Sequence, residues 1–188
     1  MRNQVPEFLN IAEECLAKRA AGNDKNKVAM IFANDKDEAR EYTYAELDDL
    51  SARFAQSLTE RGIAPGARVL LRLPNTVAFP VAFFGSMRAG AIPVPTSPML
   101  TAAEVRYLIT NSGADAIVTE EKLWSAVANE IPAREVKALY VSGLSSTTGA
   151  INFEDELAAK KPAANIHRAR SADAAYLVYT SGTTGYPK

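Results

Sequence analysis

The last ten residues of the chain, YTSGTTGYPK, carry side chains and a backbone suited to binding phosphate. Two glycines allow a sharp turn and a close approach of backbone N–H groups to a ligand. Hydroxyl groups and a lysine add further donors and a positive charge, and this set of donors suits a polyphosphate. The candidate phosphate-binding residues are Thr180, Ser181, Gly182, Thr183, Thr184, Gly185 and Lys188.

This loop differs from the GxxxxGK[ST] phosphate loop at one position. Its lysine stands six residues after the first glycine, as in that pattern, but Pro187 replaces the second glycine. Proline has no N–H to donate and biases Tyr186 towards an extended backbone, so the loop is not expected to run smoothly into a helix. The alternative is a plain glycine-rich surface turn. The length of the motif, directly after the strand-like AAYLVYT (174–180), favours the phosphate site.

The elements that must position this loop alternate along the chain. Short apolar runs predict strands, and segments of helical periodicity lie between them. This alternation predicts an α/β fold with a largely parallel sheet flanked by helices, and a loop delivered to a strand end where ligands of such sheets bind. The expected strands are 27–33, 67–73, 89–95, 114–119, 136–142 and 174–180, and the expected helices are 8–22, 43–62, from 77, 101–113, 120–129 and 153–160.

Two of these helices carry clear start signals. Thr43 with Glu46, and Thr101 with Glu104, have the spacing of a capping box. Gly113 suits the end of the second helix. Helix and strand boundaries are therefore best defined in the segments that surround the central strands.

Composition and charge exclude several classes of protein. The chain has 188 residues and a net charge of −1, so nothing electrostatic favours nucleic acid or an anionic membrane. One cysteine permits neither an internal disulfide nor a cysteine metal cluster. The apolar stretch 77–100 contains prolines that break a single helix, so a buried helix followed by a buried strand is expected instead of a membrane span. With no apolar signal at the start, a cytoplasmic location is expected.

Three blocks of the sequence resemble the adenylate-forming (AMP-binding) enzymes, which include acyl- and aryl-CoA synthetases, luciferases and peptide-synthetase adenylation domains. The terminal loop resembles the family's signature phosphate loop. The other two blocks are YTYAELDDLSARFAQSLTERGIAPGARVLL and FPVAFFGSMRAGAIPVPTSPMLTAAEVRYLITNSGADAIV. The resemblance runs from about residue 8 to 188, and within the family FPVAFFGSMRAGAIPVP is most similar to benzoate-type CoA ligases.

The resemblance implies a two-step reaction. ATP and a small carboxylic acid give an acyl-adenylate and pyrophosphate, and a thiol, usually that of CoA, then takes the acyl group. By position, the loop residues listed above would hold the β- and γ-phosphates with Mg²⁺. Family members are much longer, which implies that residues 1–188 are an incomplete N-terminal domain ending inside the phosphate loop, without the C-terminal domain. No catalytic residue and no metal ligand is expected in such a fragment, which would be inactive alone.

Other interpretations stay open. The chain could be a non-catalytic nucleotide-binding or interaction module of the same fold, an adenylating enzyme with a non-CoA acceptor, or an unrelated phosphate-loop hydrolase, which Pro187 disfavours. The uncovered strand 174–180 predicts self-association as a homodimer.

Five further residues are assigned structural roles. Cys15 is expected in the buried face of the first helix. His167 is expected in a solvated linker, because no partner group is apparent. Exposure to water at the protein surface is expected for Arg72, Arg88 and Arg106, with contact to CoA phosphates as the alternative.

Overall fold

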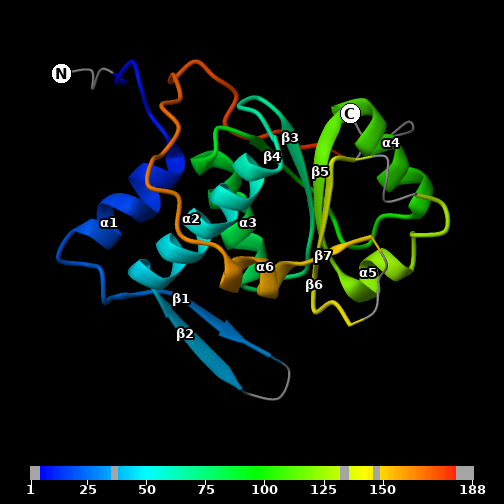
Figure 1. The fold of residues 1–188 in the computed structure, drawn as a ribbon, viewed down its shortest axis with the longest axis horizontal. Helices are drawn as coiled ribbons and strands as arrows, with labels where there is room; N and C mark the ends of the chain where they lie inside the picture. The colour runs from blue at the N-terminus through cyan, green and yellow to red at the C-terminus, as the bar shows by residue number, and fades with distance from the viewer. Residues whose placement is uncertain (1–4, 35–37, 132–135, 146–148, 181–188) are drawn as a thin grey trace.

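A five-stranded parallel sheet forms the centre of the computed structural model, which describes residues 5–34, 38–131, 136–145 and 149–180 (Figure 1). Within these residues the strand order is β4-β3-β5-β6-β7, and every neighbouring pair is parallel. The α/β prediction is therefore confirmed. The strands are β3 (Arg68–Arg72), β4 (Ile92–Pro95), β5 (Ala114–Glu120), β6 (Ala138–Ser142) and β7 (Ile151–Asn152).

Helices cover both faces of the sheet (Figure 1). Successive strand residues face opposite sides, so Val69 and Leu71 join one apolar cluster and Leu70 joins the other. The first cluster packs under α2 (Tyr44–Glu60), α3 (Ala78–Arg88) and α6 (Phe153–Ala159), and the second under α4 (Ala102–Ser112) and α5 (Glu121–Ser125).

Both predicted capping boxes are confirmed. Thr43 N donates to Glu46 Oε2 at 2.7 Å, and Glu46 N donates back to Thr43 Oγ1 at 3.2 Å. Thr101 and Glu104 form the same pair of bonds at the start of α4. The backbone N–H of the threonine holds the pKa of each glutamate below its usual range. Gly113 ends α4 with a left-handed φ of 62°.

The amino-terminal part forms short elements that pack against α2, with Leu16 and Tyr42 in the first apolar cluster. A π-helical turn (Glu13–Ala17) runs into α1 (Lys18–Ala21), and β1 (Val28–Ala33) pairs antiparallel with β2 (Ala39–Thr43). The sequence predicted a strand at 27–33, which is β1, but β2 was not among the expected strands.

The prediction that Cys15 is buried is wrong, because its side chain is exposed. The inward positions of this helix are Ala12 and Leu16. Adjacent residues point about 100° apart around a helix, so Cys15 is turned away from the core by the orientation that buries Leu16.

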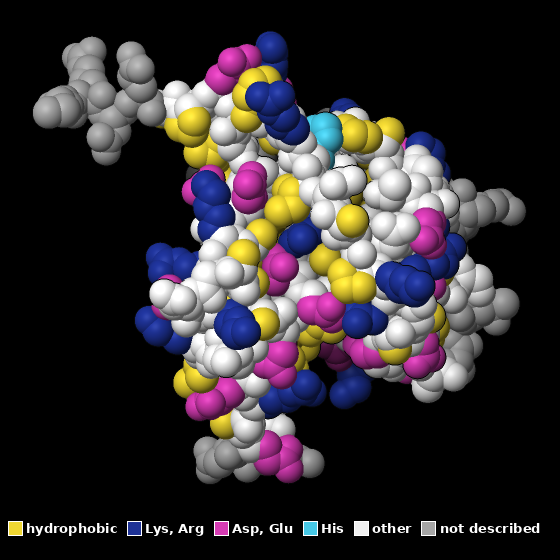
Figure 2. All heavy atoms as spheres, turned by 60° about the vertical axis from the view of Figure 1, so that its left-hand side comes forward, with side chains coloured by type: hydrophobic (Ala, Val, Ile, Leu, Met, Phe, Trp, Pro, Cys, Tyr) yellow, Lys and Arg dark blue, Asp and Glu magenta, His cyan; other side chains and the backbone are white. Residues whose placement is uncertain are grey.

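The apolar stretch 77–100 forms α3 and then β4, as expected. Among the described residues, no helix is both long and apolar enough to span a membrane. On the face drawn in Figure 2, basic and acidic side chains lie interspersed instead of gathering into a field of one sign.

Candidate functional site

Only the first residue of the candidate phosphate loop falls in the described part of the chain, and Thr180 is exposed there. The other candidates lie outside the described residues: Ser181, Gly182, Thr183, Thr184, Gly185 and Lys188. Their role in phosphate binding stays a prediction.

The segment that leads to the loop, 174–180, is not a strand, so that prediction is wrong. It lies beside β4, where Leu177 N donates to Pro93 O at 3.0 Å. β4 directs alternate N–H groups inward to β3, and its outward positions are Pro93 and Pro95. Because proline has no N–H, this edge of the sheet offers carbonyls without the donors that a further strand needs.

This segment also reaches a different end of the sheet from the one expected. The Tyr176 ring lies 5.8 Å from that of Phe83 in α3. Three residues later, the Tyr179 hydroxyl donates to Asn111 Oδ1 at 2.6 Å, in the last turn of α4 and just before β5 begins. The described flank of the loop therefore crosses from the α3 face to the α4 face at the amino ends of the strands.

A cavity of about 510 Å³ lies at the same end, between residues 9–11 and the segment 167–175. His167 lines it and is partly buried, so the solvated-linker prediction is wrong. The His167 backbone N–H donates to Arg88 O at 2.8 Å, and its carbonyl accepts a bond from Asn10 Nδ2 at 3.0 Å. Its ring lies against Gly90, where an added Cβ would come within 2.5 Å of the ring.

Two of the three arginines expected at the surface are buried, so that prediction is wrong for Arg72 and Arg88 and confirmed for Arg106, which is exposed. Arg88 Nη1 donates to Asp48 Oδ1 in α2 at 2.5 Å. Arg72 lies at the carboxyl end of β3, and burial lowers the pKa of its guanidinium. Its bonds go to three backbone carbonyls: those of Pro98 and Leu100, between β4 and α4, and that of Leu123 in α5.

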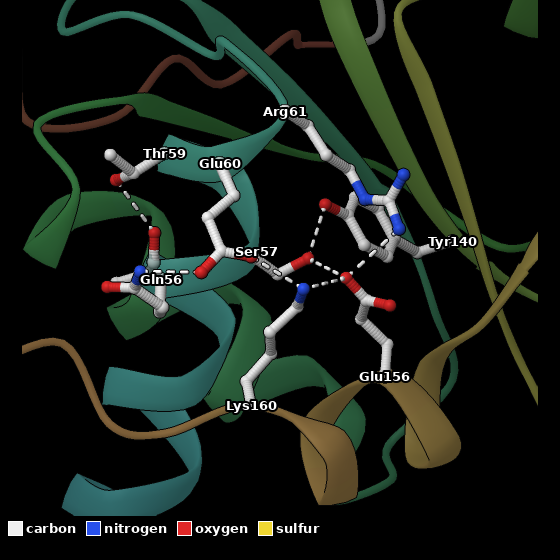
Figure 3. Close-up of polar contacts among 9 residues, drawn as sticks. Gln56, Ser57, Thr59, Glu60, Arg61, Tyr140, Glu156 and Lys160 are labelled. Atoms are coloured by element: carbon white, nitrogen blue, oxygen red, sulfur yellow. Dashed lines mark hydrogen bonds and ion pairs between the residues drawn. The ribbon is translucent and has the colours of Figure 1, made fainter.

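A polar network links α2, β6 and α6 (Figure 3). Ser57 Oγ donates to Glu156 Oε1 at 2.6 Å and lies 2.9 Å from the Tyr140 hydroxyl, which therefore acts as the donor to Ser57. Arg61 and Lys160 pair with the same carboxylate at 3.0 and 3.5 Å. These mutual bonds give the network a structural role, because they occupy the groups that a substrate would need.

The network sets two pKa shifts. Burial raises the pKa of Tyr140 to about 12. For Glu156, burial acts to raise the pKa, but the hydrogen bonds from Ser57 and Arg61, with the charges of Arg61 and Lys160, outweigh it and lower the pKa.

The model of one protein family, described as AMP-binding enzyme, matches residues 16–188. The chain belongs to this family. A medium/long-chain-fatty-acid–CoA/3-oxocholest-4-en-26-oate–CoA ligase of Mycobacterium tuberculosis H37Rv is 35% identical over 186 residues, which are 96% of this chain and 32% of that protein. The mitochondrial acyl-coenzyme A synthetase ACSM5 of Mus musculus is 31% identical over 195 residues, covering 100% of this chain and 33% of the relative.

Solved structures of AMP-binding relatives have the same fold. An acyl-CoA synthetase of Brucella canis matches with a TM-score of 0.87 and 26% identity, over 100% of this chain and 34% of that structure. A benzoate CoA ligase of Burkholderia xenovorans LB400 matches with a TM-score of 0.75 and 30% identity, over 91% and 32%. The chain thus has an acyl-CoA synthetase-like fold and spans about a third of the length of these relatives.

Proposed function

We propose that these residues form part of an ATP-dependent carboxylic acid–CoA ligase. The observation that carries the proposal is that the match to the AMP-binding family extends through the whole terminal loop, to residue 188. In the first step, the acid's carboxylate attacks the α-phosphorus of ATP, and the bond to pyrophosphate breaks. In the second, the CoA thiol loses its proton and attacks the acyl carbon, and AMP leaves.

In this proposal the loop binds the β- and γ-phosphates of ATP. The hydroxyl groups of Thr180, Ser181, Thr183 and Thr184 and the nearby backbone N–H groups donate to phosphate oxygens, and Lys188 supplies a positive charge. Donors fixed in place lower the barrier to pyrophosphate departure, because negative charge increases there in the transition state. Mg²⁺ bound with the nucleotide would neutralise part of the phosphate charge.

We further propose that residues 1–188 are the first part of a larger N-terminal domain. Relatives about three times as long support this. A phosphate loop provides one wall of a nucleotide site, and affinity also requires adenine and ribose pockets. The 188-residue chain alone is expected to release no pyrophosphate and to give no saturable calorimetric signal with Mg²⁺-ATP at sub-millimolar concentrations, the usual range for functional sites.

Exchange of labelled pyrophosphate into ATP tests the first step. The protein expressed from the complete reading frame that encodes these residues is assayed with acetate, benzoate and a medium-chain fatty acid. Exchange that depends on one of these acids supports the proposal, and its absence with every acid contradicts it. Thioester formation on adding CoA then separates a CoA ligase from an adenylating enzyme with another acceptor.

Self-association as a homodimer belongs to the same proposal. Tyr176, Leu177 and Val178 are exposed large apolar side chains beside an edge of the sheet, and such groups favour pairing with a second copy. Sedimentation at tens of micromolar, a working range for such contacts, is expected to show a dimer. Monomer alone at that concentration would contradict it. The cytoplasmic location stays a prediction.

A further inference from the structure

Arg72 is a buried cation that lacks a carboxylate partner among the residues the structure describes. Its side chain is 5% exposed. Its guanidinium Nη atoms donate at 2.7–2.8 Å to carbonyls, and Nε has no hydrogen-bond partner in the described part of the chain. A carbonyl carries only a partial negative charge, so these bonds do not neutralise the guanidinium. Burying a charge without a counter-ion is costly, and an anion beside it would offset that cost.

Thr119 lies directly beside Arg72. The two residues are partners in the parallel register of β3 and β5. Leu70 and Ile117, two positions before each of them, belong to the same apolar cluster, so both side chains lie on the α4 face of the sheet. Thr119 is 1% exposed, and its hydroxyl has no partner among the described residues.

Buried polar atoms without a hydrogen-bond partner in the described part of the chain lie at the carboxyl ends of β3 and β5. Four buried side-chain polar atoms of the described residues lack a hydrogen-bond partner. Besides those of Arg72 and Thr119, a third belongs to Thr76, in the connection that follows β3, and the fourth is Nε of Arg88, at the end of α3. Each such group costs about 1–3 kcal/mol when it stays unpaired, so a ligand that bonds to both Arg72 and Thr119, which are neighbours in the sheet, would remove this cost.

The topology of the sheet independently marks the same place. From β3 the chain crosses to β4 on one side, and then returns over β3 to place β5 on the other. The strand order therefore reverses between β3 and β5. In open α/β sheets, ligands bind outside the carboxyl ends of the strands at such a switch point, where Arg72 and Thr119 lie.

We propose that the carboxyl ends of β3 and β5 form a binding site for a small oxyanion, a carboxylate or phosphate group, held by Arg72 Nε and the Thr119 hydroxyl. Charged N–H and hydroxyl donors are the groups that oxyanions accept from in proteins. The turn at Pro98 and Leu100 lies against the guanidinium, because both of its carbonyls accept bonds from Arg72 Nη2 at 2.8 Å. Met99, at its tip, is 90% exposed and does not anchor it. The site stands independently of the proposed ligase activity.

Thermal unfolding of the 188-residue chain tests this site. Acetate, benzoate and inorganic phosphate are titrated separately at an ionic strength held constant with sodium chloride. At a hundredfold excess over the dissociation constant, the bound anion is expected to raise the unfolding midpoint by about 5–10 °C. A larger response to the carboxylates or to phosphate identifies the source of the oxyanion. No rise beyond that in sodium chloride, as expected if a water fills the position, overturns the proposal.

The variant Thr119→Val tests whether the anion binds at the Thr119 hydroxyl. Valine keeps the shape and removes the unpartnered hydroxyl, so the variant is expected to unfold at a higher temperature without anion and to lose most of the anion-dependent rise. Thr110→Val, on the exposed side of α4, is the matched control and is expected to keep the full rise. A full rise in Thr119→Val overturns the assignment.

The Arg72 Nε–H resonance gives a second readout that requires no variant. It is expected to shift along the titration with the same dissociation constant as the thermal effect. An unmoved resonance during a saturable thermal response would place the anion elsewhere and overturn the proposal.

Discussion

The two buried arginines, Arg88 and Arg72, have opposite environments. Arg88, at the end of α3, pairs with the carboxylate of Asp48, and its carbonyl accepts a bond from His167. Arg72, at the carboxyl end of β3, has backbone carbonyls as partners and no carboxylate among the described residues. Among these residues Nε is unpartnered in both arginines, so the contrast lies in the carboxylate alone. The charge of Arg88 is thus neutralised by a carboxylate of the chain itself, whereas no carboxylate that the structure describes neutralises the charge of Arg72, and this difference is the basis of the proposed anion site.

Asp48→Ala is expected to have the largest effect, because it makes Arg88 resemble Arg72. Removing one partner of a buried pair leaves an uncompensated charge and costs about 3 kcal/mol of unfolding free energy. Urea unfolding measures it. The matched control is Asp49→Ala, which breaks a more exposed, i,i+4 pair with Arg53 within α2 and is expected to cost less than about 1 kcal/mol. Equal losses of unfolding free energy in Asp48→Ala and Asp49→Ala would contradict the assignment of Asp48 as the counter-ion of a buried charge.

Gly90→Ala tests the packing of His167 at the amino end. Gly90 has a φ of 79°, and an added Cβ would meet the His167 ring, so a cost of about 2 kcal/mol is expected. Gly113→Ala has a similar φ of 62° but open space around the Cβ, and about 1 kcal/mol is expected. Thermal unfolding of both variants isolates the histidine contact. Indistinguishable thermal unfolding midpoints of the two variants would show that the His167 ring does not pack firmly against Gly90.

Tyr140→Phe probes the buried network beneath α2, which is also completed by its own side chains. The variant removes the bond to Ser57 and leaves that between Ser57 and Glu156, so a loss of about 1 kcal/mol is expected. Urea unfolding at neutral pH measures it. No loss at all would mean that the hydroxyl contributes nothing to stability.

The pH dependence of stability gives the smallest effect. The pKa of Glu156 is lower in the folded state than its usual value of 4.5, so its ionised form stabilises the fold above that value. This contribution disappears as the pH falls through the lower, folded-state pKa. Glu156→Gln is expected to be less stable than the parent at neutral pH, with a difference that shrinks below about pH 4.5. A difference that does not change with pH would contradict the assignment.

The features that sequence predicted well are local. Thr43 and Glu46, like Thr101 and Glu104, lie three residues apart, so their capping boxes are visible without the fold. The alternation of strands and helices gave the fold class for the same reason. The family resemblance rested on contiguous blocks.

The features that sequence missed depend on contacts between distant residues. Arg72 and Thr119 are 47 positions apart, and only the β3–β5 register makes them neighbours. Arg88 and Asp48 are 40 apart and likewise gave no sign of pairing. The segment 174–180 has the composition of a strand, but the prolines of β4 remove the donors that it would pair with.

Lys188→Ala tests most directly whether the terminal loop binds the phosphates of ATP. It is made in the protein expressed from the complete reading frame and assayed by acid-dependent exchange of pyrophosphate into ATP. Loss of this positive charge is expected to lower the exchange rate about a hundredfold, whereas Lys161→Ala, at an exposed position, keeps the parent rate. Parent-level exchange in Lys188→Ala would contradict the account of the loop.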